Sequence, residues 1–288
     1  MPRLPRSLMQ SGSFWMLVAS LLFACMGAFV KLGAAYFSTA ELVFYRCFVG
    51  LLVVGGVVLM RGGSLKTPVL GTQLTRAIAG TLSLMLYFYA IAHLPLATAV
   101  TLNYTSPLFL ALLTTVWLGE RLSLSLLGAV LLGFAGVVLL LHPTFERDQW
   151  FAGLMGLASG FGAGIAYLNV RILGEAGEPE WRTVFYFSLV ASLGGAAWML
   201  FGRFSPLTLH NIWLVAGMGA SATGAQLAMT RAYRKGRTLV VASLAYTTVV
   251  GSSLFGMAIW GDRQGWMGWL AMLLIMASGV WTHRASRG

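Results

Sequence analysis

The chain lacks the charged residues that a water-soluble protein needs on its surface. Only 9% of its 288 residues are Asp, Glu, Lys or Arg, whereas 58% are hydrophobic. Soluble domains carry about 25% charged residues. A surface this apolar requires a lipid solvent, and a helix that crosses a bilayer takes roughly 20 apolar residues. We therefore expect an all-α membrane protein with ten transmembrane helices joined by short loops.

Groups that perform metal or nucleophilic chemistry are also scarce. The chain has eight acidic residues, four histidines and two cysteines, Cys25 and Cys47, which lie in apolar segments without a cysteine neighbour. It has no HExxH pair and no GxxxxGK[ST] phosphate loop. We expect no enzymatic activity, ATP-driven pumping, metal or cofactor. A membrane-embedded enzyme is the alternative of a different class, and a channel would need a ring of repeated polar groups.

Positive charge is the one charge in excess, with a net value of +11. The basic residues stand singly between apolar segments instead of forming a basic aromatic face, so we exclude nucleic acid as a partner. In a membrane protein such an excess marks cytoplasmic loops. The apolar segments lie near 13–33, 40–60, 74–92, 97–118, 123–142, 150–171, 182–202, 211–230, 238–260 and 265–283.

The distribution of the basic residues predicts the orientation. If the N-terminus is inside, fourteen of the nineteen basic residues lie in inside segments and three, Arg147, Arg203 and Arg263, lie outside. Arg76 counts here as an inside residue. We expect a multi-pass protein of the bacterial cell inner membrane with cytoplasmic N- and C-termini. The first apolar segment is long for a signal peptide, so we interpret it as an uncleaved helix.

An internal repeat divides the chain. Trp117–Arg121 and Ile259–Arg263 share a Gly-acid-Arg core at an offset of 142 residues, and Tyr104-Thr105 matches Tyr246-Thr247 at the same offset. Weaker matches pair Ala19-Ser20 with Ala158-Ser159 and Glu41 with Glu180. We predict a first five-helix repeat over 1–143 and a second over 144–288. Because five is odd, the second repeat is inverted, as in many secondary transporters.

The fourth and fifth segments resemble a known family. Tyr104–Phe109, Leu118–Leu122, Gly128-Ala129 and Gly136-Val137 resemble the EamA-type branch of the drug/metabolite transporter superfamily. The resemblance implies ten helices around a central cavity and export or uptake of small metabolites. Bacterial exporters of aromatic and other amino acids are similar in length and aromatic content. The second half departs from the pattern, with Asp262 in place of Glu and Val249 in place of the proline equivalent to Pro107.

A substrate cavity requires polar or aromatic groups inside the apolar bundle. The candidates are Ser83, Tyr87, Thr101, Asn103, Tyr104, Thr105, Pro107, Tyr167, Asn169, Gln226, Ser243, Tyr246, Thr247 and Arg46, and the eighth segment also offers Thr223. Tyrosine suits an amphipathic substrate, although mid-span tyrosines also serve packing. Ser and Thr usually bond their own helix backbone. Pro107 frees a carbonyl one turn earlier, which we expect to face the cavity.

Charged residues within the segments are few. Arg46 either binds a carboxylate or braces helix ends, and we favour the brace. Glu41 and Lys31 are expected to reach the membrane surface, and Glu41 is the only candidate for proton coupling. We therefore expect facilitated diffusion or weak coupling to the membrane potential. Gly156, Gly160 and Gly164 indicate close helix packing. The expected partners are a small-molecule substrate and the lipid bilayer, with the protein a monomer or weak dimer.

Overall fold

The computed structural model describes residues 11–94, 96–120, 123–142, 149–202, 204–261, 263 and 265–285, and all regular elements in these ranges are helices. The first half contains α2 (Gly12–Gly33), α3 (Thr39–Met60), α4 (Leu70–His93), α5 (Leu96–Asn103), α6 (Ser106–Leu118) and α7 (Leu124–Leu141). The second contains α8 (Trp150–Glu175), α9 (Glu180–Met199), α10 (Ile212–Lys235), α11 (Thr238–Leu244), α12 (Thr247–Trp260) and α13 (Trp266–Ala285). The prediction of an all-α protein is confirmed.

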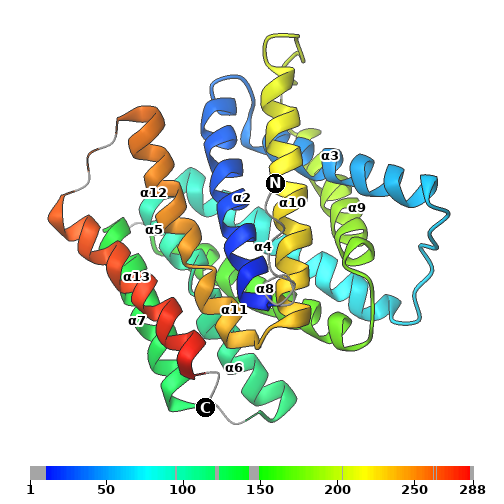
Figure 1. Ribbon diagram of the computed structural model, residues 1–288. Helices are drawn as coiled ribbons and strands as arrows, with labels where there is room; N and C mark the ends of the chain where they lie inside the picture. The colour runs from blue at the N-terminus through cyan, green and yellow to red at the C-terminus, as the bar shows by residue number, and fades with distance from the viewer. Residues whose placement is uncertain are drawn as a thin grey trace, which may run out of the picture.

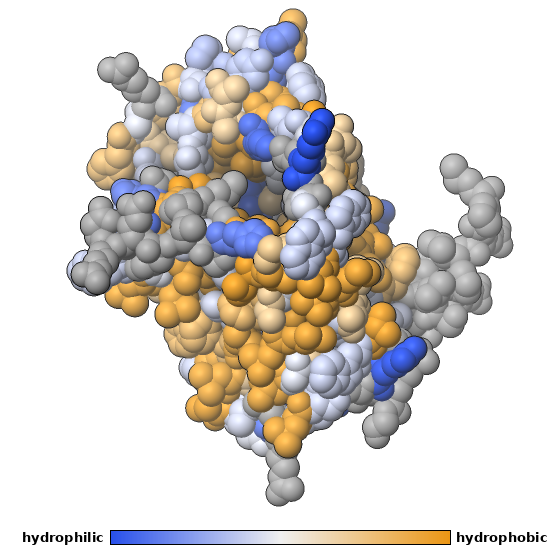
Figure 2. Space-filling view, turned by 90° about the vertical axis from the view of Figure 1, so that its left-hand side faces the viewer, coloured by the Kyte–Doolittle hydropathy of each residue, from blue (hydrophilic) through white to orange (hydrophobic). Residues whose placement is uncertain are grey.

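Eight stretches of the described residues have the length and apolar composition to cross a bilayer, and two of these, Thr98–Leu118 and Thr238–Trp260, are each built from two consecutive helices. The shorter apolar helix within α13 and the twenty-residue α9 lie beside them, which is consistent with the ten predicted segments. Large apolar side chains cover most of the middle of the face shown in Figure 2, as a lipid-facing surface requires.

The fourth and ninth segments are broken at equivalent places. The Thr105 hydroxyl donates to the Leu102 carbonyl at 2.6 Å, and the Thr247 hydroxyl donates to the Leu244 carbonyl at the same distance. A threonine that bonds its own backbone bends a helix. Gly119 and Gly261 then end α6 and α12 with φ of 67° and 70°, a left-handed conformation that favours glycine. The 142-residue repeat is therefore also a repeat of backbone conformation.

The role predicted for Pro107 is wrong. Pro107 lies in the first turn of α6, where a missing N–H group disrupts no hydrogen bond. The second break forms with Val249 in the equivalent position. The Asn103 carbonyl lies 3.3 Å from the place that a Cβ on Gly160 would take, so it faces α8 instead of a cavity.

Helices from the two halves are exchanged between two bundles. The first bundle contains α4, α5, α6 and α8, and the second bundle contains α2, α10, α11 and α12. Helix α8 packs on α4, α5 and α6 as α2 packs on α10, α11 and α12, so each half gives its first helix to the other bundle. Pairs α3–α9 and α7–α13 join the bundles across the pseudo-two-fold axis (Figure 1).

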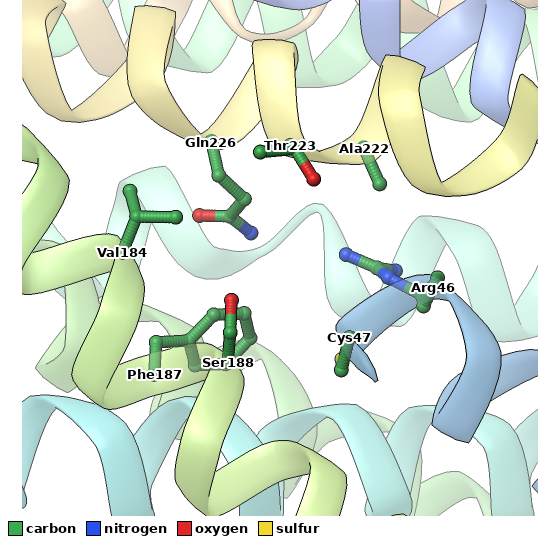
Figure 3. Close-up of a pocket in the computed structure, with 8 residues that line it drawn as sticks. All are labelled: Arg46, Cys47, Val184, Phe187, Ser188, Ala222, Thr223 and Gln226. Atoms are coloured by element: carbon green, nitrogen blue, oxygen red, sulfur yellow. The ribbon is translucent and has the colours of Figure 1, made fainter. Parts of the chain in front are cut away.

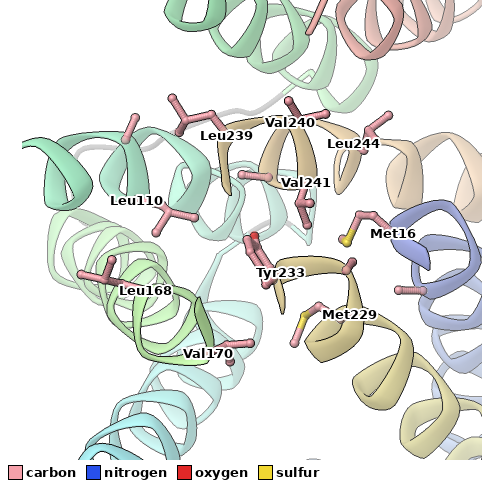
Figure 4. Packing of buried hydrophobic residues seen from close by; sticks show 14 of the residues in the cluster. Met16, Leu110, Leu168, Val170, Met229, Tyr233, Leu239, Val240, Val241 and Leu244 are labelled. Atoms are coloured by element: carbon pink, nitrogen blue, oxygen red, sulfur yellow. The ribbon is translucent and has the colours of Figure 1, made fainter. Parts of the chain in front are cut away.

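Each bundle is held together by small residues and by a serine on its exchanged helix, which packs next to the break. In the first bundle, Asn103 donates to Ser159 at 3.1 Å, and Ser83 donates to the Ser159 carbonyl at 2.7 Å. In the second bundle, Ser20 donates to the Leu244 carbonyl at 3.3 Å. The weak match of Ser20 with Ser159 therefore marks equivalent positions. An apolar cluster around Met16, Leu110 and Leu168 fills the space between the bundles near α11 (Figure 4).

Glu41 differs from its prediction. Its side chain is fully buried, and its carboxylate accepts hydrogen bonds from the backbone N–H of Ser38 at 2.7 Å and of Ser205 at 2.6 Å. The Ser205 hydroxyl adds a third bond at 3.0 Å. Glu41 does not reach toward the membrane surface, because it caps α3 and ties that helix to the segment between α9 and α10.

The fit of Gly160 against the α5–α6 break gives a stability prediction. A Cβ at Gly160 would lie 2.3 Å from the Thr105 hydroxyl and 2.7 Å from the Leu102 carbonyl. We expect Gly160→Ala to lower the free energy of unfolding by about 1–3 kcal/mol because the backbone has to shift. Thermal unfolding in detergent measures the change.

Gly56→Ala is the matched control, because a Cβ at Gly56 meets nothing within 4 Å. Alanine has the higher helix propensity, so this variant should be as stable as the parent or up to about 1 kcal/mol more stable. Equal effects of the two substitutions would show that helix propensity, and not the contact with α5, determines the result.

Candidate functional site

Two arginines are buried at the centre of the helical assembly. Arg46 on α3 is 9% exposed and Arg76 on α4 is 2% exposed. Both interact electrostatically with Cys47 and with Tyr167, so they share one region of the interior. Arg76 was counted among the inside basic residues, and the structure adds that it lies in the second turn of α4, with its side chain buried.

Arg76 connects the two bundles. Its Nη2 donates to Gln226 Oε1 on α10 at 3.2 Å, and its guanidinium lies 4.1 Å from the centre of the Phe187 ring on α9. A Cβ on Gly80 would lie 2.7 Å from Arg76 Nη1, so the glycine leaves room for the folded arginine. Nε and Nη1 are buried without a hydrogen-bond partner in the described part of the chain. Arg76 is therefore only partly satisfied.

A small cavity of about 10 Å³ lies beside these groups. Arg46 and Cys47 on α3, Phe187 and Ser188 on α9, and Thr223 and Gln226 on α10 contribute to its lining, with Val184 and Ala222. In Figure 3, the Gln226 amide, the Ser188 hydroxyl and the Arg46 guanidinium point into the space between α3, α9 and α10. Arg46 makes no hydrogen bond or ion pair with the described residues. The hydrogen bonds to helix ends that the favoured role as a brace requires are therefore not among its described contacts.

Two pairs of tyrosines also form contacts between the two bundles. Tyr167 on α8 stacks on Tyr233 of α10 with ring centres 5.4 Å apart and planes 17° apart. Tyr104, at the first break, lies 6.1 Å from Tyr246 at the second break. Tyr87 interacts electrostatically with Arg46 and with Tyr104. A group of tyrosines therefore lies beside the two arginines, and the pairs are shared by elements of both bundles.

A larger cleft of about 590 Å³ opens between the bundles at the ends of α6, α8 and α10. Glu120, Arg171 and Glu175 line it from the first bundle, and Tyr233, Arg234, Lys235 and Arg237 line it from the second. Arg171 bonds both oxygens of Glu120 and bonds Glu175 at 2.7 Å. The hydrogen bonds from Arg171 lower the pKa of Glu120 more than its desolvation raises it. Tyr233 links the cleft to the stacked Tyr167 beside the arginines.

The structure brings some of the candidate residues together and separates others. Those near the buried arginines or between the bundles are Arg46, Gln226, Tyr87, Tyr104, Tyr167 and Tyr246. Those that bond helix backbone are Ser83, Thr105, Thr247 and Asn169, the last to the Ile165 carbonyl at 2.9 Å. Ser243 bonds Thr282 on α13 at 2.9 Å. Thr101 and Pro107 are buried on the broken segment, and Arg121 and Asp262 lie outside the described residues.

Sequence reasoning missed four residues at this centre. Arg76 was counted only as an inside basic residue, and Cys47, Phe187 and Ser188 had no feature that separated them from packing residues. One signal was present for Arg76, because it lies in an apolar segment where a charge is costly. The other three are brought to the cavity by the packing of α3 against α9, which no local pattern reports.

Comparisons with known proteins agree with this architecture. The sequence profile of the EamA-like transporter family matches residues 10–142. The chain is 30% identical over 281 residues to the pseudopaline exporter CntI of Pseudomonas aeruginosa, covering 98% of this chain and 99% of the relative. It is 25% identical over 277 residues to a riboflavin transporter of Vibrio cholerae, covering 93% of this chain and 91% of the relative.

A solved crystal structure shares the fold. It superposes with a TM-score of 0.86 at 20% identity and covers 97% of this chain and 100% of the solved one. The similarity to CntI along nearly the full length of both chains extends the relationship beyond the first half. These relatives are transporters, which confirms the expectation of a transporter and not an enzyme. The chain is a multi-pass membrane transporter that belongs to the EamA-like transporter family.

Proposed function

We propose that the chain exports small metabolites, amino acids foremost, across the bacterial inner membrane by alternating access. The observation that carries this proposal is the difference between contacts within and between the bundles. Within each bundle, glycines and serines allow close packing. Between the bundles, the apolar cluster around Met16 is accompanied by a contact of Arg76 with Gln226 and by contacts of tyrosine with tyrosine. Such polar and aromatic contacts can be exchanged for contacts to a substrate.

The exchange of helices between halves supplies the moving parts. Each bundle is continuous through close packing, so it moves as a body about the pseudo-two-fold axis. The cleft gives access from one end, and the Tyr167–Tyr233 stack lies between that cleft and the arginine pair. Separation of the stack would connect the cleft with the centre. The predicted repeat boundaries, 1–143 and 144–288, fit this arrangement, and we retain them.

Amino acids fit the chemistry of the centre. Tyrosine rings accept an apolar side chain while their hydroxyls accept or donate hydrogen bonds. The relatives named above act on pseudopaline and on riboflavin, which are small molecules. The basic ends of α8 and α10, which line the cleft, lie on the side that the positive-inside bias makes cytoplasmic. We therefore place both termini and the cleft in the cytoplasm and treat the protein as a monomer or weak dimer.

A panel of labelled amino acids tests the substrate. In proteoliposomes, we expect counterflow of at least one aromatic amino acid above that of protein-free liposomes, because the tyrosines at the centre suit an aromatic side chain. Cells expressing the chain should also resist toxic amino-acid analogues. Absence of flux for every member of the panel would exclude amino acids and leave another small metabolite as the substrate.

Cross-linking tests the movement of the bundles. Glu120→Cys with Arg237→Cys places thiols on opposite walls of the cleft, whereas Glu120→Cys with Arg171→Cys places both on the first bundle. We expect a short bifunctional thiol reagent to lower flux about tenfold or more in the first pair, because opening and closing is needed in every cycle. The second pair should keep its flux.

The parental chain, which retains Cys25 and Cys47, receives the same reagent as a further control. Full flux in the cross-linked 120–237 pair, with the link confirmed by mass spectrometry, would contradict alternating access through this cleft.

Among the residues that the structure describes, no carboxylate at the centre is suited to proton coupling. The described carboxylates lie at helix ends, and Glu41 is held by Ser38 and Ser205. We expect an imposed pH gradient to produce no accumulation in proteoliposomes, whereas a membrane potential has at most a weak effect. Accumulation that follows the pH gradient and disappears in Glu41→Gln would refute this.

A further inference from the structure

Arg46 and Arg76 place positive charge in the protein interior, and no described carboxylate pairs with either of them. A buried ion without a partner destabilises a protein by several kcal/mol, and arginine is costly at membrane depth. The described carboxylates are engaged elsewhere. Glu41 bonds Ser205, Glu120 and Glu175 bond Arg171, and Glu178 bonds Arg182. Glu180 pairs with Arg234 at 3.4 Å.

The contacts that Arg76 does make are weak substitutes for a counter-ion. The Gln226 amide is neutral, and the Phe187 ring offers a cation–π interaction worth about 0.5–2 kcal/mol. Two of its nitrogens, Nε and Nη1, remain without an acceptor. An arginine edge binds a carboxylate through two parallel hydrogen bonds. Nε and Nη1 lie on different edges of the guanidinium, so each can form such a pair with Nη2 once Gln226 is displaced.

The fold does not require these arginines. At the 139-residue offset of Glu41 and Glu180, Arg46 corresponds to Phe185, and at the 142-residue offset that aligns α4 with α10, Arg76 corresponds to Met218. The equivalent helices α9 and α10 form without a charge at those positions. A residue that served only helix packing would be expected at the equivalent position of both repeats, because the equivalent helices pack alike. The arginine pair is an addition to one half.

We propose that Arg46 and Arg76 bind a carboxylate group of the transported substrate, so that the protein carries organic acids or zwitterions and discriminates against the corresponding amides. This inference rests on the proposed function and names its substrate class. The carboxylate replaces Gln226 as the acceptor for Arg76 and is bound from α3 by Arg46. The nearby tyrosines, Tyr87 and Tyr167, hold the rest of the molecule.

The cleft that leads towards Arg46 and Arg76 is positively charged, as the entry of a carboxylate requires. Arg234, Lys235 and Arg237 line the cleft from the second bundle, and only two carboxylates, both bound to Arg171, are among the described residues that line it. A cleft lined mainly by one sign of charge raises the local concentration of ions of opposite charge. The present cavity of about 10 Å³ is too small for a substrate, so the carboxylate enters when the bundles separate.

Cys47 is a reporter already in place, because it lines the cavity and interacts with both arginines. In a Cys25→Ser background, the protein reacts with sulfonatoethyl methanethiosulfonate, an anion, or with trimethylammonioethyl methanethiosulfonate, a cation. The ratio of the two rates is compared with the ratio for a free thiol in the same detergent. We expect the protein to favour the anionic reagent by about tenfold or more relative to that reference.

Arg46→Met and Arg76→Met should each lower that preference about tenfold, and Arg61→Met, at the exposed end of α3, should leave it unchanged. Methionine is apolar and similar in length, so we expect both central variants to unfold at the same or a higher temperature in detergent. A brace of helix ends would give a lower temperature instead. Arg46→Lys and Arg76→Lys should keep part of the preference but lose the paired geometry.

Transport measurements provide the second test of the carboxylate site. Labelled phenylalanine should exchange in proteoliposomes at least about tenfold faster than labelled phenylalaninamide, and the difference should vanish in Arg76→Met. Equal transport of acid and amide, an absent reagent preference, or an unreactive Cys47 would each overturn the carboxylate site. If no amino acid is carried but the reagent preference holds, the amino-acid substrate of the proposed function fails and the carboxylate site stands.

Discussion

The lipid interior provides no water for backbone hydrogen bonds, and this constraint shapes the whole molecule. A helix satisfies the constraint by itself, but a broken helix does not. The α5–α6 and α11–α12 breaks exist because a threonine hydroxyl bonds the exposed carbonyl and a neighbouring helix of small residues covers it. The glycines of α8 and Ser20 of α2 are therefore conditions for the breaks. The breaks in turn place Tyr104 and Tyr246 opposite each other at the centre.

The two bundles differ in what they contribute although their backbones are alike. The first bundle supplies Arg76 and Tyr167, and the second supplies Gln226 and Tyr233. A symmetric scaffold therefore contains an asymmetric centre. Symmetry serves the movement, because both access states can use equivalent packing. Asymmetry serves recognition, because a small substrate has two different ends.

Much of the fold could be predicted from the sequence. Composition and the alternation of basic residues indicated ten spans, and Tyr104-Thr105 with Tyr246-Thr247 indicated the repeat, although the helix breaks at these pairs were not predicted. The centre was less accessible to such reasoning. Arg76 was missed because it was counted with the inside basic residues, although it lies within the apolar segment 74–92 and in the second turn of α4. Glu41 was misplaced because its partner Ser205 is remote in sequence. Phe187 and Ser188 reach the cavity only through the packing of α9 on α3, which depends on tertiary contacts.

The exchange of first helices between bundles also has a consequence for biosynthesis. Helix α2 packs on α10, α11 and α12, and these are made only after about two hundred further residues. During translation, α2 therefore enters the bilayer with its packing face against lipid, and this face stays exposed to lipid until α10, α11 and α12 have been made. Helix α8, in contrast, emerges after α4, α5 and α6 and joins a bundle that is already present. The first bundle can thus assemble on the ribosome, whereas the second closes only when the chain is nearly complete.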